Sequence, residues 1–236
     1  AQTISFGAFD YPLAGRTLTV DANGSNNATM DFSTASSAVF NVSGTLVLDG
    51  HDASNRAIIT SDNDPGSRID VEITGTLTAD YFTFEYPDLN GLHVTGSSAQ
   101  TISFGAFDYP LAGRTLLNLS SATNITNDLI TGCSFGNSSG VSGPKNVTAD
   151  GTTDVVTFTV FSGVLASNAT VAEDNDVEAG SNNKLIWFNN NYYSDGNTNP
   201  NTLGNWYTAT NGTGLNPSNF TTSSHKFIVQ SGDTYT

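Results

Sequence analysis

Short runs of alternating apolar and polar residues recur along almost the whole chain, and they restrict its fold more than any other feature. Examples are TISFGAF from residue 3, AVFNVSGTLVLDG from residue 38 and DVVTFTVF from residue 154. A period of two sends successive side chains to opposite faces of a β-strand. Gly, Asn, Asp, Ser and Pro separate the runs, as tight turns require, and no long helical stripe interrupts them. The sequence therefore predicts an all-β protein.

The spacing of these runs favours a solenoid. Strand centres recur at intervals of 23, 27, 25, 23, 28, 23 and 30 residues, at Phe9, Phe32, Ile59, Phe84, Phe107, Phe135, Phe158 and Phe188. The related segments FEYP at Phe84 and FDYP at Phe107 each place an aromatic strand before a proline-led turn. This pattern predicts a parallel β-helix with coils of about 23 residues and aromatic ladders between coils. One or more antiparallel β-sandwiches, with strands about 8–12 residues apart, are the alternative.

In its recurring SFxxxxG and GLHVTG segments, the chain resembles right-handed parallel β-helix proteins of the secreted and cell-surface type. The resemblance implies a right-handed β-helix body over residues 1–190. Beyond Phe188 the sequence becomes rich in Asn and Gly and ends in a strand-like run, HKFIVQSGD from residue 225. That part resembles connecting segments of large modular surface proteins of bacteria. We therefore expect residues 191–236 to form an irregular segment with a terminal strand that connects subunits.

One segment, AQTISFGAFDYPLAGRTL, occurs twice without a single difference, at residues 1–18 and 99–116. A solenoid coil is a self-contained unit, so a duplicated coil is tolerated where its neighbours suit it. We expect both copies to meet similar stacking partners. The inner copy has a coil on each side, so something is expected to stack on the N-terminal copy as well.

Both ends of the expected β-helix consist of strand-like runs with no amphipathic helix to cover them. Uncovered strand edges invite strand addition from another chain, and a head-to-tail contact that does not close generates a filament. The alternative is that the sequence stops within a longer array. The residues expected at the self-association interface are Ile4, Phe6, Phe9, Tyr11, Phe227 and Val229.

The charge and the asparagine content of the chain indicate its cellular location and its partners. The chain has 7 basic and 22 acidic residues and a net charge of −15, so nucleic-acid binding and membrane insertion are not expected. A single cysteine, Cys133, excludes an intrachain disulfide, and we expect a buried thiol. Scarce Lys and Arg and many N-x-S/T sequons favour a secreted, cell-surface glycoprotein, although a chain so rich in Asn, Ser and Thr produces sequons by chance. The candidate glycan acceptors are Asn23, Asn27, Asn41, Asn118, Asn124, Asn137, Asn146, Asn168, Asn211 and Asn219.

Two further groups of residues are candidate sites. The acidic run VAEDNDVEAG offers Glu173, Asp174, Asp176 and Glu178 as a weak Ca²⁺ site, with a solvated turn as the alternative. No other cofactor is expected. Tyr192, Tyr193, Trp206 and Tyr207 are candidates for stacking on glycan rings, and the alternative is that they form a small core. The three histidines are isolated and no catalytic motif is visible.

These observations predict a non-enzymatic extracellular structural protein, the subunit of a head-to-tail homopolymeric filament or surface fibre. A cell-surface adhesin or glycan-binding module is one alternative. A β-helix polysaccharide lyase or hydrolase is another, and it would need paired carboxylates in one groove.

Overall fold

The computed structural model describes residues 3–5, 9–10, 15–22, 24, 26–32, 38–61, 68–120, 124–150, 156–159, 161–163, 176–178, 185–188, 191–196, 199–207, 216–217, 220 and 226–233. The chain divides into two units, Ala1–Trp187 and Phe188–Thr236, near the expected boundary at residue 190. The helical elements in the described ranges are short 3-10 turns, η1 (Thr126–Asp128) and η3 (Leu203–Asn205). No described helix has the length and apolar character needed to cross a membrane.

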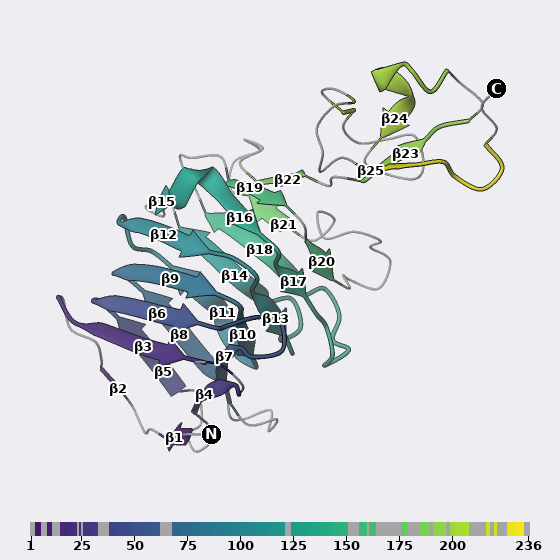
Figure 1. The fold of residues 1–236 in the computed structure, drawn as a ribbon. Coiled ribbons are helices and arrows are strands. Elements are labelled where there is room, and N and C mark those ends of the chain that lie inside the picture. The colour runs from purple at the N-terminus through teal and green to yellow at the C-terminus, as the bar shows by residue number, and fades with distance from the viewer. Residues whose placement is uncertain are drawn as a thin grey trace. The chain divides into compact units, whose positions relative to one another are not determined.

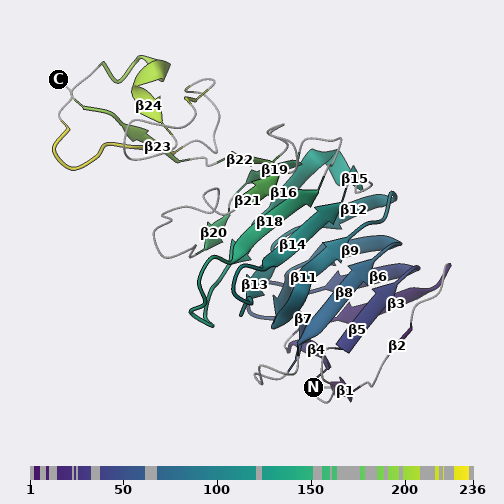
Figure 2. The ribbon, with the colours of Figure 1, turned by 180° about the vertical axis from the view of Figure 1, so that it is seen from behind.

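The first unit is a parallel β-helix, as the sequence predicts, and each of its first five coils adds one strand to each of three sheets (Figures 1 and 2). Sheet I contains, in order, β1 (Thr3–Ser5), β4 (Ala28–Asp31), β7 (Ala57–Thr60), β10 (Phe82–Glu85), β13 (Ala106–Asp108), β17 (Ser134–Phe135) and β20 (Ser162–Gly163). Sheet II contains β2 (Phe9–Asp10), β5 (Ala38–Val42), β8 (Ile69–Ile73), β11 (Pro87–Val94), β14 (Thr115–Ser120), β18 (Lys145–Asp150) and β21 (Asp176–Glu178).

Sheet III contains β3 (Thr17–Asp21), β6 (Thr45–Asp49), β9 (Thr76–Asp80), β12 (Ala99–Ile102) and β15 (Asn124–Ile125). A shorter parallel sheet is formed by β16 (Leu129–Thr131), β19 (Val156–Thr159) and β22 (Leu185–Phe188). It adjoins the end of β12 through a parallel bridge between Ser103 and Thr131.

The strand register shows which expected spacings are correct. Phe84 pairs with Phe107 across β10 and β13, which confirms the spacing of 23 residues at that step. Phe9 pairs with Phe40 in sheet II, however, and not with Phe32 as the regular spacing suggests. Apart from a bulge in β11, paired residues lie 21 to 31 positions apart. The coils differ in length because the segments between strands differ, while the strands themselves stay in register.

The core of the β-helix is built from the inward-facing residues of each strand. In β8, for example, Ile69, Val71 and Ile73 are fully buried, and the alternate residues Asp70 and Glu72 are half-buried. The expected aromatic ladder is present: the rings of Phe107 and Phe135 stack with centroids 5.3 Å apart, and Phe84 meets Phe107 edge-on at 6.5 Å. Such pairs add to the burial energy because ring edges and faces carry opposite partial charge.

The FEYP and FDYP segments form the corner between sheets I and II. Tyr86 and Tyr109 have φ angles of 56° and 57° there, and their rings stack at 4.3 Å. Left-handed backbone costs a residue with a side chain about 1 kcal/mol, which the stacking offsets. Arg68 donates hydrogen bonds to the carbonyls of Pro87 at 3.1 Å and Tyr109 at 2.6 Å, and so links two successive coils.

An equivalent arrangement closes the corner before sheet I. Tyr81 and Phe104 also have positive φ, and their rings stack at 4.4 Å. Arg56 donates to the carbonyls of Phe82 and Phe104, both at 2.7 Å. On the next coil the position is taken by Gly132 with a φ of 69°, and a Cβ there would lie 2.3 Å from the Phe104 ring. Glycine is therefore required at that position.

The duplicated segment occupies two different phases of the β-helix. In the first copy β1, β2 and β3 belong to sheets I, II and III, whereas the equivalent β12, β13 and β14 belong to sheets III, I and II. Leu18 accordingly pairs with Leu46 in sheet III, while its equivalent Leu116 lies in sheet II. The expectation that both copies meet similar partners is wrong. All three faces demand the same alternation of inward and outward residues, so one sequence fits any of them.

A buried glutamine links two coils from inside sheet III. The side chain of Gln100 is fully buried. Its Oε1 accepts a hydrogen bond from the Leu77 N–H, and its Nε2 donates to the carbonyls of Gly75, Gly96 and Ser98. Every polar atom of the amide is therefore satisfied, which a buried polar side chain requires.

The second unit contains a small sheet in the order β24 (Trp206–Tyr207), β23 (Asn191–Ser194), β25 (Lys226–Ile228). The ring of Phe227 lies 5.5 Å from that of Tyr192, 5.1 Å from Trp206 and 5.1 Å from Phe220. Tyr192 and Trp206 are 0% and 4% exposed. These aromatic side chains form a small core.

The substitution Gln100→Ala is expected to lower the free energy of unfolding by about 2–4 kcal/mol, because it leaves buried backbone groups without partners. Denaturant unfolding followed by circular dichroism measures the loss. Thr101→Ala, at the exposed neighbouring position of β12, is the control and should change stability by about 0.5 kcal/mol or less. Equal losses in the two variants would contradict a structural role for the amide.

Cys133 is free and buried, as the sequence predicts. Burial raises the pKa of its thiol to about 12, so the reactive thiolate is scarce at neutral pH. We expect the native protein to leave a chromogenic disulfide reagent unreacted over hours at pH 8, and the protein unfolded in guanidinium to react within minutes. Rapid labelling of the folded chain would show that the surrounding coils open.

Candidate functional site

One short motif is repeated on three successive coils of sheet III. The segments TLTVD, TLVLD and TLTAD form β3, β6 and β9, and they pair residue by residue. The leucines point inward, and Leu46 and Leu77 are fully buried. The first, third and fifth residues of each motif therefore share the outer face. This motif was not among the sites expected from the sequence, although its recurrence after 28 and 31 residues is a signal visible there.

The outer residues form two parallel ranks, which we term the threonine face. The first rank consists of Thr17, Thr45, Thr76 and Ala99, and the second of Thr19, Val47, Thr78 and Thr101. Neighbouring members of a rank are about 4.8 Å apart, and the two ranks are about 6.6 Å apart along the strands. Thr101, the last residue of the second rank, donates a hydrogen bond from its hydroxyl to that of Thr126 at 3.2 Å.

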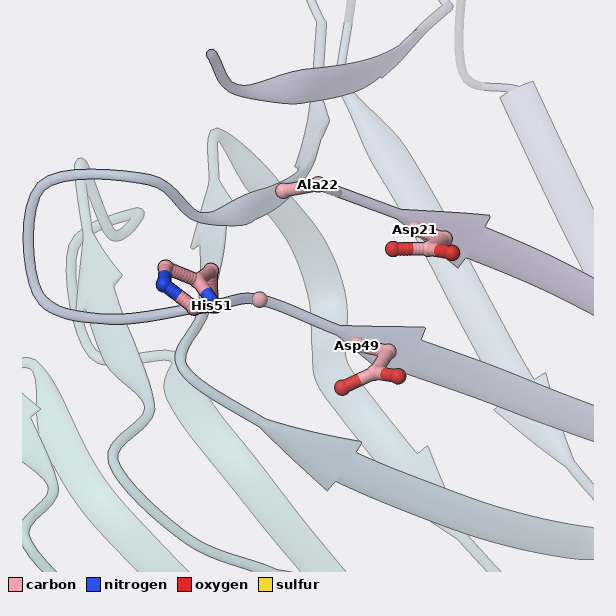
Figure 3. A pocket seen from close by; sticks show the side chains of 5 residues that line it. Asp21, Ala22, Asp49 and His51 are labelled. Atoms are coloured by element: carbon pink, nitrogen blue, oxygen red, sulfur yellow. The ribbon is translucent and has the colours of Figure 1, made fainter. Parts of the chain in front are cut away.

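A row of aspartates borders the threonine face at the carboxyl ends of the strands. Asp21, Asp49 and Asp80 lie on consecutive coils, and the Ser103 hydroxyl donates to Asp80 at 2.7 Å. Figure 3 shows the Asp21 and Asp49 carboxylates side by side near His51. They line a groove of about 430 Å³ together with Ala22, Gly50 and His51. The described residues hold no cluster of three or more His, Cys, Asp or Glu side chains suited to a metal ion.

The outer face of sheet II is charged. Glu72 pairs with His93, which in turn pairs with Asn118. Burial raises the pKa of Asp70 on the same face, and Asp88 and Glu72 raise it further, while a hydrogen bond from Asn90 and the charge of His93 oppose the shift. The Oδ1 atoms of Asp70 and Asn118 are buried and have no hydrogen-bond partner in the described part of the chain.

Sheet I carries a pair of carboxylates on neighbouring coils, Glu85 and Asp108. Burial raises the pKa of Glu85, although the Thr60 hydroxyl donates to it at 3.1 Å and opposes the shift. Asp108 accepts hydrogen bonds from the backbone N–H groups of Tyr109 and Ser138 and from the Ser138 hydroxyl. Both oxygens of Asp108 therefore hold the turn at Ser138.

The structure separates the candidate glycan acceptors by accessibility. Asn27, Asn41 and Asn124 are exposed, and Asn118 and Asn137 are half-buried. Asn146 is 1% exposed, and a folded chain has no room for a sugar on a buried amide. Asn23, Asn168, Asn211 and Asn219 lie outside the described residues.

Two of the four aromatic candidates for glycan stacking lie in the small core of the second unit. Tyr192 and Trp206 are buried against Phe227, so their rings are covered and cannot stack on a sugar. Tyr193 and Tyr207 are half-buried and pair across β23 and β24.

The residues expected at the assembly interface lie in both units. Ile4 and Phe9 are in β1 and β2, the terminal strands of sheets I and II, while Phe6 and Tyr11 lie outside the described residues. Phe227 belongs to the small aromatic core of the second unit, and Val229 is 50% exposed.

The candidate Ca²⁺ ligands are divided between a strand and undescribed chain. Asp176 and Glu178 belong to β21, where they pair with Val147 and Ala149 of β18 and do not form a loop. Glu173 and Asp174 lie outside the described residues.

The raised pKa of Asp70 predicts a pH-dependent effect of its removal. The folded state retains the proton to higher pH than the unfolded state, so this carboxyl's contribution to stability is lost as pH rises above its ordinary value of 3.8. Asp70→Asn should stabilise the protein by less than about 1 kcal/mol at pH 7, because the group is only partly buried. The gain should vanish at pH 3. Unfolding curves at the two pH values measure it, and a gain of equal size at both would contradict the shift.

The chain matches no known family model, no curated protein and no solved structure. Its function must therefore be inferred from the geometry of its own described residues.

Proposed function

We propose that the chain is a non-enzymatic extracellular structural protein whose subunits join head to tail through open strand edges. The observation that carries this proposal is the first strand of sheet III. β3 pairs with β6 on one side, and no strand of the described residues pairs with its other side.

The direction of the backbone groups in β3 defines this edge. The Ala22 N–H donates to Asp49, and the Arg16 carbonyl accepts from the Thr45 N–H, both at 2.8 Å. In a parallel pair alternate residues bond to the same neighbour. The N–H and C=O groups of Thr17, Thr19 and Asp21 therefore point to the open side. No proline or lysine blocks these positions, which are the usual means of protecting an edge strand.

Two surface properties support an extracellular fibre. The net charge of −15 keeps chains soluble and disfavours side-by-side association. Exposed sequon asparagines such as Asn41 and Asn124 are accessible for glycosylation.

The Glu85–Asp108 pair does not favour a polysaccharide lyase or hydrolase, because Asp108 accepts hydrogen bonds from Ser138.

A cell-surface adhesin is the second candidate, and the threonine face favours it. An adhesive surface needs outward polar groups fixed in place, and this face presents them on a rigid sheet. A filament of such subunits would repeat the face along its length, so the two candidates are compatible.

The test uses the open edge of β3. Thr19→Pro removes an N–H that points away from β6, so it should preserve the β-helix and block addition of a strand. We expect the unaltered protein to form filaments in negative-stain electron microscopy and to sediment as polymer. Thr19→Pro should lower the sedimenting fraction at least ten-fold.

Thr19→Val is the matched control, because it keeps the N–H and the shape of the side chain, and it should polymerise like the unaltered protein. Circular dichroism of each monomer checks the fold. A wholly monomeric unaltered protein at high concentration, or filaments of Thr19→Pro at the normal level, would overturn the proposal.

A further inference from the structure

The threonine face is distinguished by its regularity. Six of the eight positions in the two ranks are Thr, and the others are Ala99 and Val47, of which Val47 has nearly the same shape as threonine. A substitution of Thr by Val keeps the methyl group in place and removes the hydroxyl. The array therefore repeats methyl groups at all eight positions and hydroxyl groups at six of them.

Strand propensity does not explain the array. Threonine is favoured on the exposed side of any strand, so a general preference would fill all three outer faces alike. The corresponding rung positions of sheet II are instead Asn41, Glu72, His93, Asn118 and Thr148. Sheet I carries Asp31, Thr60, Glu85 and Asp108 on consecutive coils. Repeated threonine is a property of sheet III.

The face is also stiff. Threonine has restricted χ1 freedom on a strand because its Cβ is branched. Leu46 and Leu77, which alternate with the outward residues on β6 and β9, are fully buried. Backbone hydrogen bonds between neighbouring strands fix the position of each strand relative to the next. Strands β3, β6, β9 and β12 run side by side in both views of the ribbon (Figures 1 and 2). Such a surface loses little conformational entropy when it binds, since its side chains are already ordered.

The two ranks are neutral in a chain of net charge −15, and the aspartate row lies along one border. A complementary occupant is therefore neutral, rich in groups that both donate and accept hydrogen bonds, and periodic in two dimensions over several rungs. A single soluble sugar would contact only one or two rungs. An ordered lattice of water molecules has all of the required properties.

We propose that the threonine face binds the surface of ice. Its repeats of about 4.8 Å across the strands and about 6.6 Å along them are of the size of the repeats on an ice crystal face. The methyl groups order the adjacent water and the hydroxyl groups bond to it, so that the ordered layer merges with the crystal. Each contact is weak, and the array acts through the number of contacts made at once. The inference does not depend on end-to-end assembly.

Partition of the fluorescently labelled full chain into a slowly growing ice hemisphere tests the proposal, together with the shape of single ice crystals in its presence. We expect the protein to enter the ice and to shape the crystals into facets. Thr78→Tyr, on an interior strand of sheet III, should lower incorporation at least five-fold, because the ring breaks the plane of the array. Tyrosine is well tolerated in strands, so the fold is expected to persist.

Asn41→Tyr is the matched control, since it places the same side chain on an exposed position of sheet II. It should leave incorporation unchanged, and Thr78→Val should retain most of it, as Val47 already occupies one rung. Exclusion from ice, or equal losses for the two tyrosine variants with intact circular dichroism, would overturn the inference. Binding to crystalline cellulose or chitin powder without any effect on ice would overturn it too, and would assign the face to a polysaccharide surface.

Discussion

The backbone ladder between successive coils is the constraint on which the rest of this structure depends. Each strand of the three sheets bonds to its counterpart one coil away, and the registers hold across loops of different length. Because the pairing is parallel and in register, equivalent residues are superposed at about 4.8 Å. Any residue type that recurs at equivalent positions then becomes a ladder, with consequences that depend on whether it faces inward or outward.

Inward ladders stabilise the fold, and corner ladders fix its geometry. Phe107 and Phe135 stack in the core, while Tyr86 and Tyr109 stack at a corner where the backbone is left-handed. Arg68 then bonds to carbonyls of two further coils. The unfavourable backbone conformation of one coil is thus offset by contacts with its neighbours, as expected for a repeat architecture whose stability comes from neighbouring units.

Outward ladders determine what the surface can do. The threonine ranks, the aspartate row and the Glu72–His93 pair occupy different positions on the same type of framework. The duplicated segment illustrates the same point. Thr17 contributes to the threonine face in the first copy, whereas the identical residue of the second copy, Thr115, lies in sheet II opposite Lys145. Neighbours across the ladder, and not the local sequence, assign each copy its role.

The sequence alone determined the all-β class, the solenoid and the ladder of Phe84 and Phe107, because alternation and spacing are local properties that the parallel register preserves. It also indicated that Cys133 is buried. Only the tertiary structure decided that Phe9 pairs with Phe40, that Asn146 is buried, and that Tyr192 and Trp206 form a core. It alone placed the repeated threonines on one face. The physical reason is that loops of unequal length set the phase of each coil, and that phase decides which distant residues become neighbours.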